Sequence, residues 1–203
     1  MSKSTVLVVD DDEGVLDSLR MTLETAGFAV QTYGSGTALL DGGGAPSGDC
    51  LLLDLNLPDL NGLEVQARLK DGRHDLPVIM ITGKGDVRSA VSAMQLGAVD
   101  FIQKPLSGDT VLESVERALL RGKKTSSTAR AERPLPSGFA RLTSREREVL
   151  EQLVAGQSNK SIAFDLGISP RTVEIHRARV MEKLQARNLA HLVRIALTAG
   201  IGT

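Results

Sequence analysis

The sequence has very few of the residues that mark disulfide-stabilised, membrane-spanning or base-stacking proteins. Its 203 residues include one cysteine, one tyrosine and no tryptophan. The single cysteine, Cys50, excludes an internal disulfide framework and a cysteine-based zinc site. No apolar run approaches the ~20 residues of a membrane-spanning helix, and no signal peptide precedes the first apolar run, so we expect a soluble cytoplasmic protein. Scarce aromatics favour an aliphatic core and disfavour a platform that stacks single-stranded bases.

Charge of each sign is unevenly divided between the two halves of the chain. Residues 1–122 hold 10 Lys and Arg against 18 Asp and Glu, whereas residues 123–203 hold 14 against 7. This division predicts two modules, of which the basic one faces a polyanion.

Short apolar runs alternate with amphipathic helical patterns through the first 122 residues. The runs predict strands over residues 5–9, 29–33, 51–54, 77–81 and 100–103. The run that ends at Asp54 lacks polar alternation, as is typical of a strand buried on both faces of a parallel sheet. Strands and helices in this order predict an α/β domain with a doubly wound parallel sheet.

Polar groups that could handle a phosphoryl group follow several of these strands. Because right-handed crossovers bring the carboxyl ends of parallel strands to one edge, we expect five side chains to meet there, namely Asp10, Asp11, Asp54, Thr82 and Lys104. Singly, each is an ordinary loop or surface residue. Together, crowded carboxylates favour a bound Mg²⁺ ion, which would let Asp54 attack a phosphoryl group while Lys104 and Thr82 bind its oxygens.

The motifs in this half resemble the receiver domain of two-component response regulators. They are Val8-Val9-Asp10-Asp11, Asp54-x-x-x-Pro58-x-x-x-Gly62, Thr82-Gly83 and Lys104-Pro105. The resemblance covers residues 4–122 and implies a five-stranded sheet of order 2-1-3-4-5. It also implies that a sensor histidine kinase phosphorylates Asp54, and that Mg²⁺ is bound by Asp11, Asp54 and the carbonyl of Asn56, with Asp10 acting through water.

The same resemblance implies a switch. Thr82 would move towards the phosphate and Phe101 would turn inward beside Lys104 and Pro105, which remodels the face formed by the fourth helix and fifth strand. Phosphorylation would then promote a homodimer through that face. Asn56 and Lys84 occupy positions that resemble the family's tuners of phosphate lifetime. Leu57, where the family usually has methionine, conserves volume.

The second half predicts a linker followed by four helices. Residues 123–140 are polar and lack apolar periodicity, which is typical of a linker, although the preceding helix could extend into their start. Residues 141–203 form the second domain. Thr143 and Glu146 have the spacing of a capping box. Gly167, Ser169 and Pro170 form a turn, a cap and a first helical position between two helices, which predicts a helix-turn-helix unit.

Residues 142–197 resemble the LuxR-type DNA-binding domain. The motifs are Leu142-Thr143-Ser144-Arg145-Glu146, Asn159-Lys160-Ser161-Ile162-Ala163 and Ser169-Pro170-Arg171-Thr172-Val173-Glu174. The resemblance implies that Glu174, Ile175 and Ala178 face base edges, and a glutamate could accept a hydrogen bond from cytosine N4. The other implied contacts, mostly with phosphates, are Asn159, Lys160, Ser169, Arg171, Thr172, Arg177, Arg179 and Lys183. The two matches together resemble the FixJ-type subgroup.

We therefore predict a response regulator that is not an enzyme and acts as a transcription activator on a two-fold site in double-stranded DNA, with RNA polymerase as a further candidate partner. One alternative is a Mg²⁺-dependent phosphatase, but Asn56 stands where its second acid is needed. Another is a phosphorelay adaptor whose terminal helices bind protein, which salt-sensitive DNA binding would exclude.

Overall fold

The computed structural model describes residues 3–41, 47–72, 76–83, 87–125 and 137–202. They divide into two compact units. The first holds a five-stranded sheet, and the second holds the elements after residue 136 together with helix α4 (Val87–Gln95). In the described part of the chain no helix is both long and apolar enough to cross a membrane.

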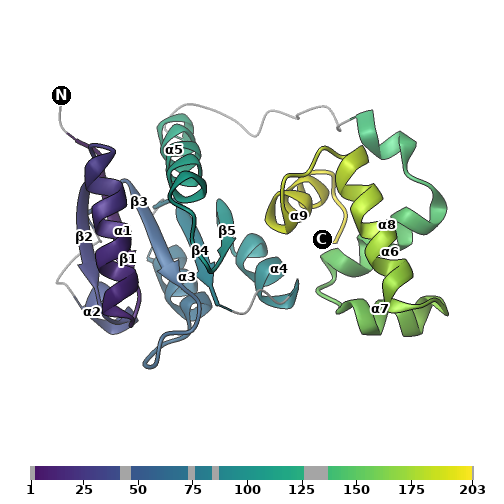
Figure 1. Ribbon diagram of the computed structural model, residues 1–203, viewed down its shortest axis with the longest axis horizontal. Helices are drawn as coiled ribbons and strands as arrows, with labels where there is room; N and C mark the ends of the chain where they lie inside the picture. The colour runs from purple at the N-terminus through teal and green to yellow at the C-terminus, as the bar shows by residue number, and fades with distance from the viewer. Residues whose placement is uncertain (1–2, 42–46, 73–75, 84–86, 126–136, 203) are drawn as a thin grey trace. The chain divides into compact units, whose positions relative to one another are not determined.

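The sheet of the first unit is parallel, with strand order β2-β1-β3-β4-β5, which confirms the predicted fold class (Figure 1). Its strands are β1 (Thr5–Val9), β2 (Ala29–Tyr33), β3 (Cys50–Asp54), β4 (Val78–Thr82) and β5 (Asp100–Gln103). Every residue of β3 and β4 is buried. An unbroken apolar run fits such central strands because helices cover both of their faces.

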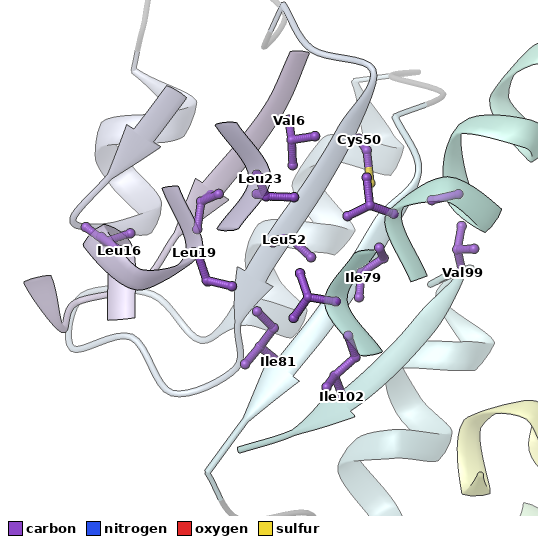
Figure 2. Close-up of a cluster of buried hydrophobic side chains, with 14 residues drawn as sticks. Val6, Leu16, Leu19, Leu23, Cys50, Leu52, Ile79, Ile81, Val99 and Ile102 are labelled. Carbon is purple, nitrogen blue, oxygen red and sulfur yellow. The ribbon is translucent and has the colours of Figure 1, made fainter. Parts of the chain in front are cut away.

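Helices α1 (Glu13–Thr25) and α5 (Gly108–Thr125) bury their apolar stripes against one face of this sheet. Leu19 and Leu23 of α1 pack with alternate strand residues such as Val6, Leu52 and Ile81 (Figure 2). The first unit also contains α2 (Gly36–Leu40) and α3 (Gly62–Asp71). Apolar residues at every second position of the strands and at every third or fourth position of the helices thus pack in one aliphatic core.

The second unit has its own aliphatic core, built from four α-helices that follow a short 3-10 helix. These elements are η1 (Ser137–Arg141), α6 (Ser144–Val154), α7 (Asn159–Leu166), α8 (Pro170–Lys183) and α9 (Leu189–Thr198). Val149, Leu150 and Leu153 of α6 are fully buried there with Val180 of α8. The four helices predicted after the linker are therefore present as α6 to α9.

The predicted linker, residues 123–140, is partly ordered at both ends. Helix α5 continues to Thr125, and η1 includes residues 137–140. The helix at its start agrees with the extension of the preceding helix that the sequence left open, because lysine is a good helix former. The rest of the linker and Lys84 lie outside the described residues.

Candidate functional site

Groups from three strand ends meet at Lys104. Its Nζ lies 2.7 Å from Asp10 Oδ2, beyond β1, and 2.9 Å from Asp54 Oδ1, at the end of β3. The backbone of Lys104 is fixed by a hydrogen bond from its N–H to the carbonyl of Thr82, at the end of β4, over 2.7 Å. The sheet therefore gathers residues that are as much as 94 positions apart in the chain.

Both carboxylates of this pocket are buried. The side chains of Asp10 and Asp54 are only 1% and 4% exposed, whereas Lys104 is 24% exposed. Burial raises the pKa of Asp10, against the lowering effect of Lys104 and of the Asp12 N–H. For Lys104, burial would lower the pKa, but its hydrogen bonds to Asp10 and Asp54 prevail and raise it. The lysine is therefore held as a cation.

Backbone N–H groups orient the remaining oxygen of each carboxylate. Asp12 N donates to Asp10 Oδ1 over 3.0 Å, and Asn56 N donates to Asp54 Oδ2 over 2.6 Å. Each donor lies two residues after its acceptor, in the turn that leaves the strand. The strand end and its turn together fix the direction in which each carboxylate points.

The loop after Asp54 folds back tightly onto the strand that carries it. Gly62 N donates to the Leu55 carbonyl over 2.9 Å, and a Cβ at Gly62 would lie 2.4 Å from the Asp54 carbonyl oxygen. Asp59 anchors the same loop to α2, because it accepts hydrogen bonds from the N–H groups of Gly36 and Thr37. Sequence reasoning missed Asp59, since an exposed loop aspartate has no distinguishing pattern.

The other predicted pocket residues differ in burial. Thr82 is fully buried and Phe101 is 9% exposed, whereas Asp11, Asn56 and Pro105 are exposed. Among the described residues, no three Asp, Glu, His or Cys side chains form a group set to hold a metal. Asp10 and Asp54 share the Lys104 ammonium, which relieves their repulsion, while the Asp11 side chain lies in water.

The pocket nevertheless fits a hard divalent cation in its chemistry. Two buried carboxylates supply oxygen ligands, and the raised pKa of Asp10 reflects a burial that a nearby positive charge would offset. Asp11 and Asn56, which follow the two strand ends closely in sequence, are exposed to water. The assignment of Mg²⁺ to these residues stays a prediction.

In the second unit, α7 and α8 are joined by the predicted tight turn. Gly167 takes a left-handed conformation with φ of 65°, which glycine adopts without strain. Ser169 then caps α8 by accepting the Thr172 N–H at 3.0 Å, and Pro170 takes the first helical position. These local interactions start α8 at a fixed place after the turn, as the helix-turn-helix prediction requires.

The predicted DNA contacts on α8 are mostly accessible. Arg171, Glu174, Ala178 and Arg179 are exposed, and Ile175 is 44% exposed. An exposed isoleucine on a charged helix is suited to contact with a base, such as a thymine methyl group. Thr172 and Arg177 are half-buried, while Ser169 and Lys160 are exposed and Asn159 opens α7 half-buried.

Three of the predicted contacts, Arg171, Glu174 and Lys183, form ion pairs within the protein. Arg171 Nη1 lies 3.1 Å from Glu174 Oε2, but this pair is exposed and therefore weak. Lys183 Nζ lies 2.6 Å from Glu146 Oε2, and the Glu146 side chain is only 2% exposed. The ammonium of Lys183 is therefore engaged in the interior of the unit.

Comparison with known proteins agrees with both units. The response regulator receiver domain model matches residues 6–116, and the model of the bacterial regulatory proteins of the luxR family matches residues 140–196. The transcriptional regulatory protein FixJ of Rhizobium meliloti is 45% identical over all of this chain and 99% of its own length. Full-length FixJ from B. japonicum, a crystal structure, is 40% identical, covers 98% of each chain and has a TM-score of 0.57.

Two further relatives match almost the whole of this chain. Nodulation protein W of Bradyrhizobium diazoefficiens is 38% identical over 98% of this chain and 88% of its own. The response regulator StyR is 36% identical over 97% of this chain and 99% of its own, with a TM-score of 0.58. The chain therefore belongs to the FixJ-type response regulators of two-component systems, in which a receiver domain is joined to a LuxR-type DNA-binding domain that controls transcription.

Proposed function

We propose that Asp54 is the phosphoryl acceptor of this regulator and that a sensor histidine kinase supplies the phosphate. The position of Lys104, bonded to both Asp10 and Asp54, is the observation that carries the proposal. A buried carboxylate beside a fixed ammonium is a nucleophile whose product charge is already partly neutralised.

The proposed roles of the surrounding residues follow from their chemistry. Asp11, Asp54 and the carbonyl of Asn56 would hold Mg²⁺, with Asp10 beside it, and the ion would supply positive charge to the phosphoryl oxygens. Lys104 binds one phosphoryl oxygen, and the buried Thr82 hydroxyl offers a neutral hydrogen bond. The added charge at Asp54 biases Thr82 and Phe101 between two positions, with Pro105 beside the moving segment.

The proposed output is a dimer on DNA. The face of α4 and β5 pairs two copies after phosphorylation, and α8 of each copy enters the major groove of one half-site. Glu174, Ile175 and Ala178 face the bases, and the basic residues at its flanks bind phosphates. The regulator acts in the cytoplasm, where promoter DNA lies, as an activator with RNA polymerase as a partner.

The experiment is selection of duplexes from a random DNA pool with and without acetyl phosphate. We expect wild-type protein to gain one phosphoryl group, to dimerise and to bind its selected duplex more tightly. Asp54→Asn should lose all three responses. Asp17→Asn is the matched control because Asp17 is 74% exposed on α1 and outside the pocket.

Two results would overturn the proposal. One is phosphorylation of Asp54→Asn to the wild-type extent. The other is an unchanged DNA affinity and oligomeric state of the wild-type protein after stoichiometric phosphorylation.

A further inference from the structure

The last turn of the recognition helix α8 is held by an ion pair between Lys183 and the buried carboxylate of Glu146. We infer that Lys183 is a positioning residue for DNA recognition, which fixes the orientation of α8 on α6 through Glu146 and does not bind the DNA backbone. This inference rests on the proposed DNA contacts of α8 and deepens them.

Glu146 connects the first turn of α6 to the last turn of α8. Glu146 Oε2 accepts hydrogen bonds from Lys183 Nζ over 2.6 Å and from Thr143 N over 2.8 Å. The same glutamate is the third residue of the capping box that starts α6. One carboxylate therefore fixes the start of α6 and the end of α8, which are 37 residues apart.

The backbone of Lys183 is enclosed as well. A Cβ at Gly138 of η1 would lie 2.2 Å from the Lys183 carbonyl oxygen, so η1 packs directly on this turn. Lys183 follows the fully buried Val180 by three residues and precedes Leu184, which is 3% exposed. Residues at this spacing share one side of a helix, so Lys183 lies at the flank of the buried face.

Electrostatics decides between the two roles of this lysine. A carboxylate that is 2% exposed is disfavoured without a cation beside it, so moving Lys183 to a phosphate would leave Glu146 buried with its charge no longer balanced by this lysine, although Thr143 N still donates to it. A single contact between an exposed lysine and a DNA phosphate replaces hydrating water and counterions, so we expect it to contribute less free energy than the Lys183–Glu146 ion pair. The ion pair therefore persists in the DNA complex.

The two roles predict different effects of two substitutions. Lys183→Met removes the ammonium and keeps the apolar stem, while Glu146→Gln removes the charge that holds Lys183 and keeps an acceptor for Thr143 N. If Lys183 positions α8, both variants impair recognition alike. If Lys183 binds phosphate, Glu146→Gln frees it and binding is unchanged or stronger.

The experiment titrates full-length phosphorylated protein against the duplex that the wild type selects and against an unrelated duplex of equal length, over a series of salt concentrations. We expect Lys183→Met and Glu146→Gln each to bind the selected duplex about tenfold more weakly, the double variant no worse, and the unrelated duplex as before. The dependence of log affinity on log salt should keep its wild-type slope. Arg179→Met, an exposed control, should weaken both duplexes and reduce the slope by about 1.

Three outcomes would overturn the inference. The first is a slope reduced by about 1 in Lys183→Met with no effect of Glu146→Gln. The second is wild-type discrimination by both variants at a temperature where circular dichroism shows them folded, which would leave the pair a purely structural role. If Lys183→Met does not fold, Glu146→Gln alone decides. Failure of wild-type protein to select any duplex is the third, and it alone would also overturn the proposed function.

Discussion

Gly62 lies where the chain passes so close to Asp54 that a side chain does not fit. A Cβ there would be 2.4 Å from the Asp54 carbonyl oxygen and 2.9 Å from Leu55 Cα, and both are backbone atoms that cannot rotate away. The glycine is therefore needed for space at this position. It lets the loop return over the strand and start α3 beside the proposed phosphorylation site.

We predict that Gly62→Ala lowers the free energy of unfolding of the first unit by roughly 1–3 kcal/mol, the usual effect of overpacking. It should also slow phosphorylation by acetyl phosphate, because the strand end that carries Asp54 must shift. Urea unfolding and phosphate incorporation measure the two effects. Gly34→Ala is the control, since a Cβ at Gly34 meets nothing within 4 Å, and an equal loss in both variants would refute the explanation.

Sequence reasoning at the residue scale found the pocket but not its supports. Asp10, Asp54 and Lys104 were predictable because polar residues that end buried runs stand out from an aliphatic sequence. The exposed state of Asp11 was not, because the strand pattern specifies where a backbone ends and not how the next side chain turns. The partner of Lys183 was also hidden, since nothing in a sequence pairs two residues 37 positions apart.

At the scale of elements, β5 and α5 are joined by a compact polar network. Asp100, which is 4% exposed at the start of β5, accepts hydrogen bonds from Ser114 Oγ at 2.9 Å and from Arg117 Nη2. Arg117 Nη1 also reaches Glu113 Oε1 at 2.6 Å. The network fixes α5 on the strand that carries Phe101, the predicted switch residue.

We predict that Arg117→Met destabilises the first unit by about 2–3 kcal/mol, because it removes a guanidinium that is paired with the buried Asp100 carboxylate. Arg117→Met combined with Asp100→Asn should recover part of that loss. Denaturant unfolding of the single and double variants gives the coupling energy. Arg171→Met, whose ion pair is exposed, should change stability by no more than about 0.5 kcal/mol, and independent, additive effects at Asp100 and Arg117 would contradict the network.

The link between α6 and α8 gives the second unit a definite response to acid. Burial would raise the pKa of Glu146, but hydrogen bonds from Lys183 and Thr143 prevail and lower it from its ordinary value of 4.5. A carboxyl whose pKa is lower in the folded state adds stability above its unfolded pKa and loses it as pH falls through the folded pKa.

We therefore predict that the second unit loses stability below pH 4.5 and that Glu146→Gln makes this loss shallower. Thermal unfolding of both proteins over a pH series, followed by circular dichroism, measures the difference. An identical pH profile for the two proteins would show that Glu146 does not carry the effect.

Helix starts were the elements that sequence predicted best. The capping box at Thr143 and the Ser169-Pro170 start of α8 depend only on neighbouring residues, so a local pattern is sufficient. Strand order depends on pairing between distant segments, and it came from the family resemblance. The sequence left open how far the last helix of the first unit extends, because polar helix formers and polar linkers have similar compositions, and the structure ends α5 at Thr125.

For the whole molecule, the main feature is that the two units have separate hydrophobic cores. Leu52 lies in the core of the sheet, and Leu150 lies in the core of the helical unit. Both side chains are fully buried. Each unit can therefore lose its packing without removing the other's core.

We predict that Leu150→Ala destabilises the second unit by about 2–5 kcal/mol and leaves unfolding of the first unit unchanged, while Leu52→Ala does the reverse. Hydrogen exchange resolved by peptide reports the two units separately. A loss of protection in both units from either substitution would mean that they unfold as one.

The single thiol of the protein lies inside the first of these cores. Cys50 is fully enclosed in β3, and burial raises the pKa of its thiol to about 12. Only the thiolate attacks a disulfide reagent, so the native protein should release no colour from Ellman's reagent until the sheet opens. Cys50 lies four residues before Asp54 on the same strand. The rate at which its thiol reacts would therefore report how often the sheet opens, and whether phosphorylation of Asp54 slows that opening.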